Sequence, residues 1–392
     1  MGKNSSKLSR RGFFNLAAAG GLGAALTPLI SKKGWSQDPQ PKVKPATNVK
    51  DALTYDRTPD SMPGKYPGKV VQVYHENCMA ENEPDQQAVD RMLETAMLEL
   101  TGLTTLRDAW LHFVSPQDRI GLKVNPVAGK LLSTSHQIVR AVIAQLEGAG
   151  IPREQIVLWD RREFELHEAG FTAENYPGIR ITGTEQQDAA GSFYDADGVL
   201  YGEKMIDKDW YYWAEVEEEY DAYTIPYMVN SGKYSYFSKI CTQQLDKIIN
   251  IPILKNAGAS VTLCLKNLAY GCISNTGRLH KDLWSETCAQ VCAFPPIRDK
   301  VVLNIADGIR GCFNGGPGAN PQFITDYKTL LVGTDPVAVD RIGYEVVLKK
   351  RIDEGIQSED QPRARQFMNM AQDLGLGIAD LDRIGVKIIQ MV

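Results

Sequence analysis

Charged and amide side chains follow several of the apolar runs that are predicted to form strands. Lys123 and Asn125 end the run 119–124, and Lys255 follows the run 247–254. Ligands of open parallel sheets bind beyond the carboxyl ends of the strands. These side chains are therefore expected to converge on one polar site. The expected set is Lys123, Asn125, Asp160, Lys255, Asn256, Lys266, Asn267, Asp307 and Asp335.

Lysines, carboxylates and amides gathered in one place suit two kinds of ligand. The lysines can hold a small anion, and the aspartates can bind a divalent cation or move protons. A buried lysine beside another cation also titrates near neutral pH, which suits acid–base catalysis. We therefore predict a catalytic group of Lys123, Lys266 and Asp307, and a ligand-binding group of Asn125, Lys255, Asn267 and Asp335.

Each of these residues also has a purely structural interpretation. Asp335 precedes Pro336 at the start of a predicted helix, where aspartate is a common N-cap. Lys123 and Lys266 could pair with neighbouring acids or extend along apolar surface. Asp307 could brace the glycine-rich segment that follows it. The sequence alone leaves these alternatives open.

The glycine-rich segment 307–318 is predicted to form a tight turn. Its backbone N–H groups could hold a phosphate or carboxylate, or it could be only a surface loop. It matches neither the Walker A pattern nor G-x-G-x-x-G. His136 lies near the end of the Lys123 strand, and His75 with Cys78 could form a metal pair; both histidines are otherwise ordinary polar residues. The chain has no H-E-x-x-H and no G-x-S-x-G, so the common zinc protease and serine hydrolase motifs are missing.

Apolar strand-like runs alternate with helical patterns from residue 70 to about residue 350. Strands are expected at 70–74, 119–124, 155–159, 247–254, 300–306 and 329–333. Helices are expected at 85–100, 135–146, 161–169, 261–270 and 337–350. Such alternation is typical of a mainly parallel, doubly wound sheet with helices on both faces. The sequence therefore predicts an α/β fold.

Three segments depart from this alternation. Residues 171–245 form an aromatic-rich insertion, with ten aromatic residues between Trp210 and Phe237. The insertion either packs on the body or on a partner chain, as aromatic residues commonly do, or stacks against a sugar or aromatic ligand. Residues 37–68 hold six prolines and are predicted to form an extended spacer. Residues 351–392 are expected to be a helical extension packed on the domain.

Residues 1–36 have the layout of a twin-arginine export signal. Arg10 and Arg11 precede a mildly apolar run from Phe13 to Ile30. We therefore expect a periplasmic or exported protein that contacts the twin-arginine translocation machinery. Cleavage near Ser36 would release it, and an uncleaved signal would leave it tethered to the membrane. This route commonly exports folded proteins that already hold a cofactor or a partner.

Charge and cysteine content exclude other classes of function. The net charge is −5, although residues 1–36 hold six basic residues and no acidic one, so the rest of the chain is more acidic still. An acidic body without basic tracts argues against nucleic-acid binding. The seven cysteines include no C-x-x-C pair, so zinc ribbons and ferredoxin-type iron–sulfur motifs lack their spacing. The cofactor is therefore left unknown, with a divalent metal compatible with the aspartates.

Four strings in the sequence resemble the domain-of-unknown-function 362 family. They are G-L-K-V-N-P (121–126), I-I-N-I-P-I-L-K-N (248–256), N-I-A-D-G-I-R-G (304–311) and L-L-V-G-T-D-P-V-A-V-D (330–340). The resemblance implies an α/β domain over 69–350 and one shared site, to which it adds Asp340 as a ligand-binding residue. Family members often have histidine where this chain has Asn256. Some members also append an iron–sulfur segment that is missing here, so the resemblance implies no cluster.

The leading hypothesis is an exported enzyme, dependent on a metal or redox cofactor, that acts on a small anionic substrate. The first alternative is a non-catalytic periplasmic binding or accessory protein for an exported enzyme or electron carrier. Such a protein would use the polar site for capture or the aromatic-rich insertion for a partner. The second alternative is a structural surface protein held by its uncleaved signal.

Overall fold

A mixed β-sheet of 11 strands forms the centre of the computed structural model, which describes residues 44–217, 220, 224–258 and 260–392. The predicted export signal lies outside the described residues. Within the described part, no helix is long and apolar enough to cross a membrane. The main strand order is β15 (Gly385–Met391), β1 (Lys69–His75), β14 (Thr329–Gly333), β12 (Val301–Cys312), β9 (Lys247–Asn250), β4 (Ile120–Lys123), β5 (Ile156–Arg162) and β6 (Arg180–Glu185).

Most neighbouring strands of this sheet run parallel. The four strands β9, β4, β5 and β6 are parallel throughout, and β12 and β15 also pair in parallel with β9 and β1. Strand β14 is antiparallel to both of its neighbours. Three short strands lie off the main path: β10 (Ile253–Ala257), β11 (Ser260–Thr262) and β13 (Ile324–Thr325). The predicted α/β fold with a mainly parallel sheet is confirmed.

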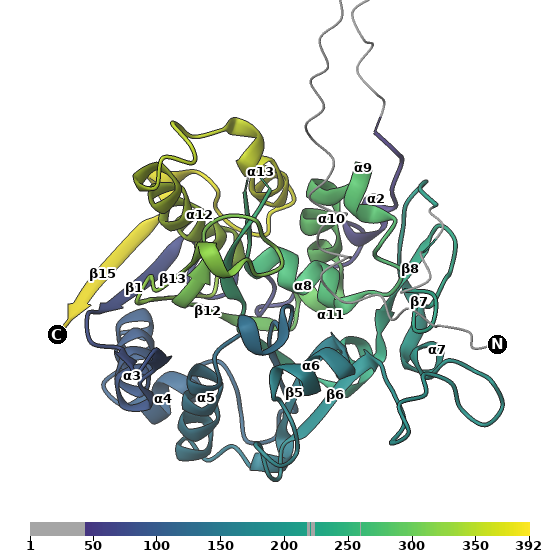
Figure 1. The fold of residues 1–392 in the computed structure, drawn as a ribbon, viewed down its shortest axis with the longest axis horizontal. Coiled ribbons are helices and arrows are strands. Elements are labelled where there is room, and N and C mark those ends of the chain that lie inside the picture. Colours follow the sequence, from purple (N-terminus) through teal and green to yellow (C-terminus); the bar gives the residue numbers. More distant parts are fainter. Residues whose placement is uncertain (1–43, 218–219, 221–223, 259) are drawn as a thin grey trace, which may run out of the picture. The chain divides into compact units, whose positions relative to one another are not determined.

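Helices cover both faces of the sheet, because side chains alternate along each strand and supply one apolar layer on each side (Figure 1). Ile248 belongs to one layer and Ile249 to the other. One face carries α3 (Gln86–Thr101), α4 (Leu106–Leu111), α5 (His136–Gly148) and α6 (Glu163–Ala169). The other carries α8 (Cys264–Cys272), α10 (Trp284–Gln290), α11 (Pro295–Arg298), α12 (Pro336–Asp353) and α13 (Gln366–Asp373).

Strand β12 is longer than the sequence predicted. We expected it to end at Ala306 and a turn to begin at Asp307, but Asp307 and Gly308 remain paired with β14, and Cys312 is paired with both β10 and β13. The glycines permit this close pairing, since a Cβ at Gly311 would lie 2.2 Å from the Leu254 carbonyl oxygen. The turn is therefore confined to the residues after Cys312.

The aromatic-rich insertion contains α7 (Tyr201–Met205) and an antiparallel ribbon of β7 (Ile206–Trp213) and β8 (Tyr234–Ser238). Tyr212 and Phe237 are buried in the core. The alternate positions form an outer aromatic face, which consists of Tyr211, Trp213, Tyr234 and Tyr236. The insertion thus packs one row of side chains on the body and leaves the other row partly exposed.

The segments that precede β1 and follow α12 belong, from residue 45 on, to the same compact unit as the sheet. In the segment predicted as an extended spacer, helix α2 (Val49–Ala52) packs on the body and Ala52 and Met62 are fully buried. At the other end, α13 is followed by strand β15, which pairs along the full length of β1.

Candidate functional site

Lys123 lies in a row of polar residues that crosses three neighbouring strands. It is paired in register with Asn250 on β9, and Asn250 is paired with Asn304 on β12. All three side chains are buried. Register neighbours on adjacent strands project from the same face of a sheet. The row therefore sits under α8, which brings Asn267 down onto it.

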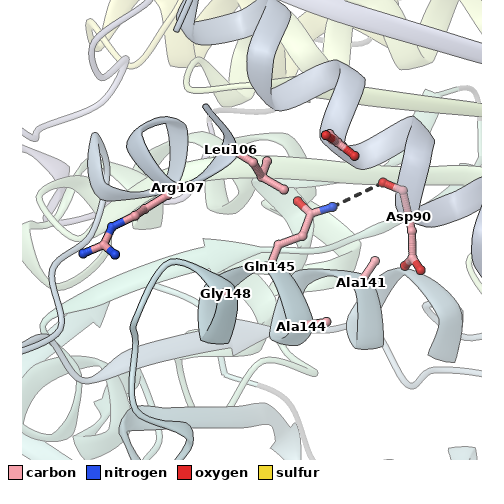
Figure 2. Close-up of a pocket in the computed structure, with 8 residues that line it drawn as sticks. Asp90, Leu106, Arg107, Ala141, Ala144, Gln145 and Gly148 are labelled. Carbon is pink, nitrogen blue, oxygen red and sulfur yellow. Dashed lines mark hydrogen bonds between the residues drawn. The ribbon is translucent and has the colours of Figure 1, made fainter. Parts of the chain in front are cut away.

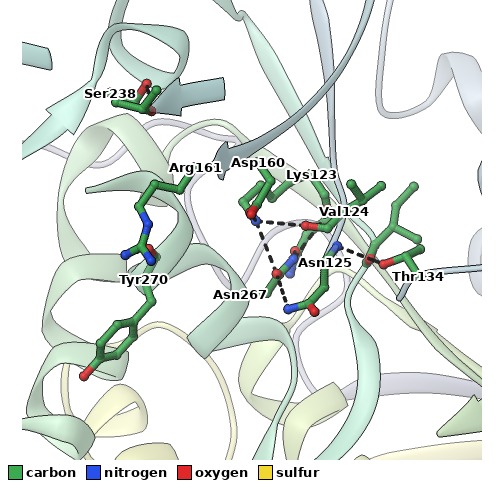
Figure 3. A network of polar contacts seen from close by, with 12 residues as sticks. Lys123, Val124, Asn125, Thr134, Asp160, Arg161, Ser238, Asn267 and Tyr270 are labelled. Carbon is green, nitrogen blue, oxygen red and sulfur yellow. Dashed lines mark hydrogen bonds and ion pairs between the residues drawn. The ribbon is translucent and has the colours of Figure 1, made fainter. Parts of the chain in front are cut away.

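The Lys123 ammonium is fully supplied with partners (Figure 3). It forms an ion pair with Asp160, donates to the Val124 carbonyl at 2.9 Å and donates to Asn267 Oδ1 at 3.2 Å. Asn125 Nδ2 donates to the same Asn267 oxygen at 3.2 Å. Buried polar groups are stable only when their hydrogen bonds are made. This group meets that condition without any added ligand.

A chain of amides extends the network across the sheet. Asn267 Nδ2 donates to Asn250 Oδ1 at 2.8 Å, and Asn250 Nδ2 donates to Asn304 Oδ1 at 2.9 Å. Asn304 Nδ2 then donates to the Thr334 carbonyl at 3.1 Å. Lys123, Asp160, Asn125, Asn267, Asn250 and Asn304 are called the Lys123 network below. Connected, satisfied networks of this kind fix the position of the groups they join.

Lys255 is adjacent to this network but is held differently. Its ammonium donates to the carbonyls of Val127 at 2.7 Å and Leu132 at 2.8 Å, with Asn125 Oδ1 at 3.5 Å. The side chain is completely buried. Because no carboxylate pairs with it in the described part of the chain, burial lowers the pKa of Lys255 to about 7. Lys255 thus closes the 127–132 loop over the sheet.

Lys266 precedes Asn267 on α8 but has a different set of neighbours. The helix puts Lys266 and Tyr270 one turn apart on one face, and the Lys266 Nζ lies 5.6 Å from the centre of the Tyr270 ring. The Trp284 ring from α10 lies 5.7 Å from the same atom. Lys266 is only 8% exposed, yet it forms no hydrogen bond or ion pair with any described residue. Among the described residues, the ammonium is instead stabilised by the faces of these two aromatic rings.

Two further basic side chains stand beside Lys266. The Arg161 guanidinium donates to the Tyr270 carbonyl at 3.2 Å and to the Thr276 hydroxyl. The His280 ring, from α9 (Leu279–Asp282), lies 4.4 Å from the Tyr270 ring. Burial, followed by Lys266 and Arg161, lowers the pKa of His280 to about 3, although its surface is still exposed to solvent. The Lys266 cluster is defined as Arg161, Lys266, Tyr270, His280 and Trp284.

Repulsion among these groups is compensated only in part. Burial lowers the pKa of Lys266, and the Arg161 charge lowers it further. Glu185 approaches Arg161 Nε at 3.7 Å, but its other oxygen accepts from Arg162 at 3.0 Å. Arg162 is also paired with Glu165 at 2.8 Å, so two glutamates balance the two arginines, and the excess positive charge of the Lys266 cluster is that of Lys266.

The carboxylate oxygens of Asp307 and Asp335 accept hydrogen bonds from backbone amides. Asp307 accepts from Ser135 N at 2.8 Å and Ile309 N at 3.1 Å, and burial raises its pKa. Asp335 caps α12 through Ala338 N at 2.9 Å and also accepts from Gly68 N and Ile378 N at 3.0 Å. Burial raises the pKa of Asp335 to about 6. Asp335 is therefore the N-cap of α12, as its structural interpretation predicted.

Asp340 secures the first turn of α8 from the neighbouring helix α12. It accepts from Cys264 N at 2.6 Å and Leu265 N at 3.0 Å, and burial raises its pKa to about 7. Asp340 thus positions the helix that carries Lys266 and Asn267. Across the described residues, no group of three or more His, Cys, Asp or Glu side chains is arranged to hold a metal ion.

The remaining motifs are accounted for by packing. His136 bonds Tyr176 Oη at 2.6 Å and the Ala169 carbonyl at 3.0 Å. In the glycine-rich segment, a Cβ at Gly316 would lie 1.7 Å from the Asn256 carbonyl oxygen, so glycine is required by close approach of two backbones. All seven cysteines are buried free thiols. None of these features forms a further candidate site.

A surface pocket of about 310 Å³ lies between α3, α4 and α5 (Figure 2). It is lined by Asp90, Leu106, Arg107 and Gln145, among others. Gln145 Nε2 donates to the Asp90 carbonyl at 3.2 Å across one end of it. No residue of the Lys123 network or the Lys266 cluster lines this pocket, so it is separate from the chemistry described above.

The segment that holds most of these side chains matches a family model. Residues 213–345 are similar to DUF362, a domain of unknown function. The resemblance expected over 69–350 is thus supported for this narrower range. The DUF362 match includes Lys255, Lys266, His280 and Trp284, whereas Lys123 and Arg161 precede it. The Lys266 cluster therefore joins the DUF362 segment to a strand outside the matched range.

Other comparisons add little to the DUF362 match. No curated protein matches the chain. A crystal structure of a Thermotoga maritima protein, from the Northeast Structural Genomics Consortium, is 7% identical with a TM-score of 0.36. The similarity covers 69% of this chain and 60% of that protein, so this chain spans less than two thirds of its length.

Sequence reasoning found part of this arrangement. Lys123, Asn125, Lys255 and Asn267 meet as expected, but Lys266 lies in a separate cluster. Asn250 and Asn304 were missed because they lie inside apolar strand runs. Arg161, His280 and Trp284 were also missed. The four-residue spacing of Lys266 and Tyr270 on one helix face was the available signal for the second cluster.

Proposed function

We propose that this chain is an exported α/β protein that binds a small anionic ligand at the Lys266 cluster. The observation that carries the proposal is Lys266, a side chain that is nearly buried and whose ammonium has no acceptor among the described residues. Burying an unpaired charge is costly, so proteins normally pair such groups. A bound anion would supply the missing partner.

The surroundings of Lys266 support an anion rather than a cation or an apolar ligand. Arg161 adds a second positive charge, and its bonds to Tyr270 and Thr276 hold it in place. The Tyr270 and Trp284 rings stabilise the ammonium when no anion is present. The ligand would approach from the side of His280, whose surface is exposed.

Anion titration of three proteins tests this proposal. Phosphate, sulfate, acetate and citrate would be titrated by calorimetry into the wild type, Lys266→Met and Lys349→Met, at constant ionic strength. Lys349 is a matched control because its side chain is 78% exposed on α12. We expect Lys266→Met to lose binding and Lys349→Met to keep it. Wild-type affinity in Lys266→Met would refute the proposal.

The exported location rests on residues 1–36 and is tested separately. Arg10 and Arg11 are proposed to engage the twin-arginine machinery, with the body delivered to the periplasm. Intact-mass analysis of the native protein would show whether residues up to about Ser36 are removed. Cytoplasmic retention of an Arg10→Lys, Arg11→Lys variant is expected. Unchanged export of that variant would contradict a twin-arginine route.

One observation favours a second candidate function, an accessory protein for an exported enzyme or electron carrier. The outer aromatic face of the β7–β8 ribbon leaves Tyr234 39% exposed, with Tyr211 and Tyr236 rings packed against it. Aromatic residues of this kind are enriched at protein interfaces. The metal- or redox-dependent enzyme has less support, because Asp307 and Asp335 direct their oxygens to backbone amides.

A further inference from the structure

His280 has one ring nitrogen whose role is fixed by the backbone. Its Nδ1 lies 3.1 Å from the Thr276 carbonyl oxygen. A carbonyl oxygen only accepts hydrogen bonds, so Nδ1 must carry the proton and donate it. In a neutral imidazole the other nitrogen, Nε2, is then an acceptor with a free lone pair.

The neutral form is the one present at physiological pH. Partial burial and the charges of Lys266 and Arg161 lower the pKa of His280 below the ordinary histidine value of about 6.5. No described residue donates a hydrogen bond to Nε2, and His280 retains exposed surface. The Lys266 cluster therefore contains two cations and one acceptor that receives no hydrogen bond from the described residues.

Thr276 connects this acceptor to the cations. Its hydroxyl accepts from Arg161, and its carbonyl accepts from His280. The His280 ring is also 4.4 Å from the Tyr270 ring, which lies beneath the Lys266 ammonium. Arg161, His280 and Lys266 thus share Thr276 and Tyr270 as neighbours, and the two cations are close enough to His280 to lower its pKa.

We propose that His280 Nε2 makes the Lys266 cluster selective for oxyanions that retain a hydroxyl group. Such an oxyanion presents charged oxygens to Lys266 and Arg161 and donates its O–H to Nε2. Inorganic phosphate is the simplest member of this class, since it keeps at least one P–OH at neutral pH, whereas sulfate has none. This inference rests on the anion-binding function proposed above.

Electrostatics alone predicts the opposite preference. Sulfate carries two negative charges at pH 7, and phosphate carries one or two, so attraction to the cations favours sulfate. Sulfate would also place an oxygen lone pair against the Nε2 lone pair and leave that acceptor without a donor. Leaving this acceptor unsatisfied or repelled lowers the binding free energy of sulfate. A loss of about 1.4 kcal/mol weakens binding tenfold, which is enough to make phosphate the tighter ligand.

Calorimetric titration of inorganic phosphate and sodium sulfate at pH 7 and equal ionic strength tests the selectivity. We expect the full-length wild type to bind phosphate at least about tenfold more tightly than sulfate. His280→Phe keeps a ring against Tyr270 but removes the acceptor, so the ratio should fall to about one or below. His280→Gln restores an acceptor oxygen and should recover part of the ratio. Lys266→Met should lose both anions.

A spectroscopic readout tests the tautomer independently of affinity. Long-range ¹H–¹⁵N correlation spectra of the imidazole should show a protonated Nδ1 and an unprotonated Nε2 in His280. Adding phosphate should shift the Nε2 resonance, and adding sulfate should not. A protonated Nε2 in the free protein would overturn the inference.

The outcomes separate the two proposals. If the wild type binds neither anion, the proposed function fails for inorganic oxyanions and the inference fails with it. If the wild type binds both anions equally, anion binding stands and the role of His280 is overturned. Undiminished preference for phosphate in His280→Phe would also overturn that role while leaving anion binding intact.

Discussion

Lys123 packs against α8 and Lys266 belongs to α8, yet the surroundings of these two buried lysines differ in kind. Lys123 has an aspartate, a carbonyl and an amide as partners and is 0% exposed. Lys266 has two aromatic faces and is 8% exposed. The charge of Lys123 is neutralised within the fold, whereas that of Lys266 is not. From this comparison we expect Lys123 to serve stability, and it is the reason that Lys266 is the residue proposed for binding.

Removing Lys123 should have the largest effect on stability. Lys123→Met leaves Asp160 buried without its cation, and breaking one side of a buried pair costs about 3–5 kcal/mol of the free energy of unfolding. Lys266→Met removes an unpaired charge and should leave the free energy of unfolding unchanged or higher. Urea denaturation of both variants measures the contrast. If both variants lost the same free energy of unfolding, Lys123 and Lys266 would not differ in their contribution to stability.

Ligand should stabilise the protein only when the Lys266 cluster is intact. At a phosphate concentration 100 times the dissociation constant, binding to the native state adds about 2.7 kcal/mol to the free energy of unfolding. Lys266→Met should show no such gain at the same concentration. Denaturant unfolding with and without phosphate gives the comparison. A wild-type gain in Lys266→Met would place the anion elsewhere.

Interrupting the amide chain should cost less than removing Lys123. Asn250→Leu removes the acceptor of Asn267 and the donor to Asn304, both of which are buried. Unsatisfied buried groups cost about 1–3 kcal/mol. Urea denaturation should therefore show a loss in that range, with phosphate affinity preserved. Loss of phosphate binding in a folded Asn250→Leu protein would show that the two regions act as one site.

The last expected effect is the pH dependence that Lys255 contributes, which is spread over several pH units. Its pKa is about 7 when folded and about 10.4 when unfolded, so the unfolded chain binds the extra proton between these values. Stability from this group therefore rises from pH 7 to about pH 10, by at most about 1.4 kcal/mol per pH unit. Lys255→Met should have a flatter profile over that range. Superimposable profiles would show that the lysine is not desolvated.

The sequence predicted the sheet better than it predicted the site. Lys123 ends β4 and Asn125 follows it, as the rule that ligands bind at strand ends predicts, and that rule needs only the order of the elements. Lys255 meets them from within β10, a short strand that the sequence did not separate from β9. Carboxylates are harder to interpret. Asp307 and Asp335 follow apolar runs in the same way, but spacing does not reveal whether an oxygen faces a ligand or a backbone amide.

The Lys266 cluster could not be assembled from sequence for a different reason. Arg161 comes from a strand, His280 from a four-residue helix and Trp284 from another helix. Their approach to Tyr270 depends on how α9 and α10 pack, which no local periodicity encodes. The fixed tautomer of His280 depends on a single carbonyl, that of Thr276, and becomes visible only in three dimensions.

The contacts of Arg298 set a limit on how far the amino terminus can be shortened. Its buried guanidinium donates to the carbonyls of Ala52, Tyr55 and Asp56, at 3.4, 3.2 and 2.7 Å. A polypeptide that begins at residue 69, where the first strand starts, would strip these acceptors from the guanidinium and open the core where Ala52 and Met62 pack. Recombinant versions that begin at about residue 45 keep all three acceptors of Arg298.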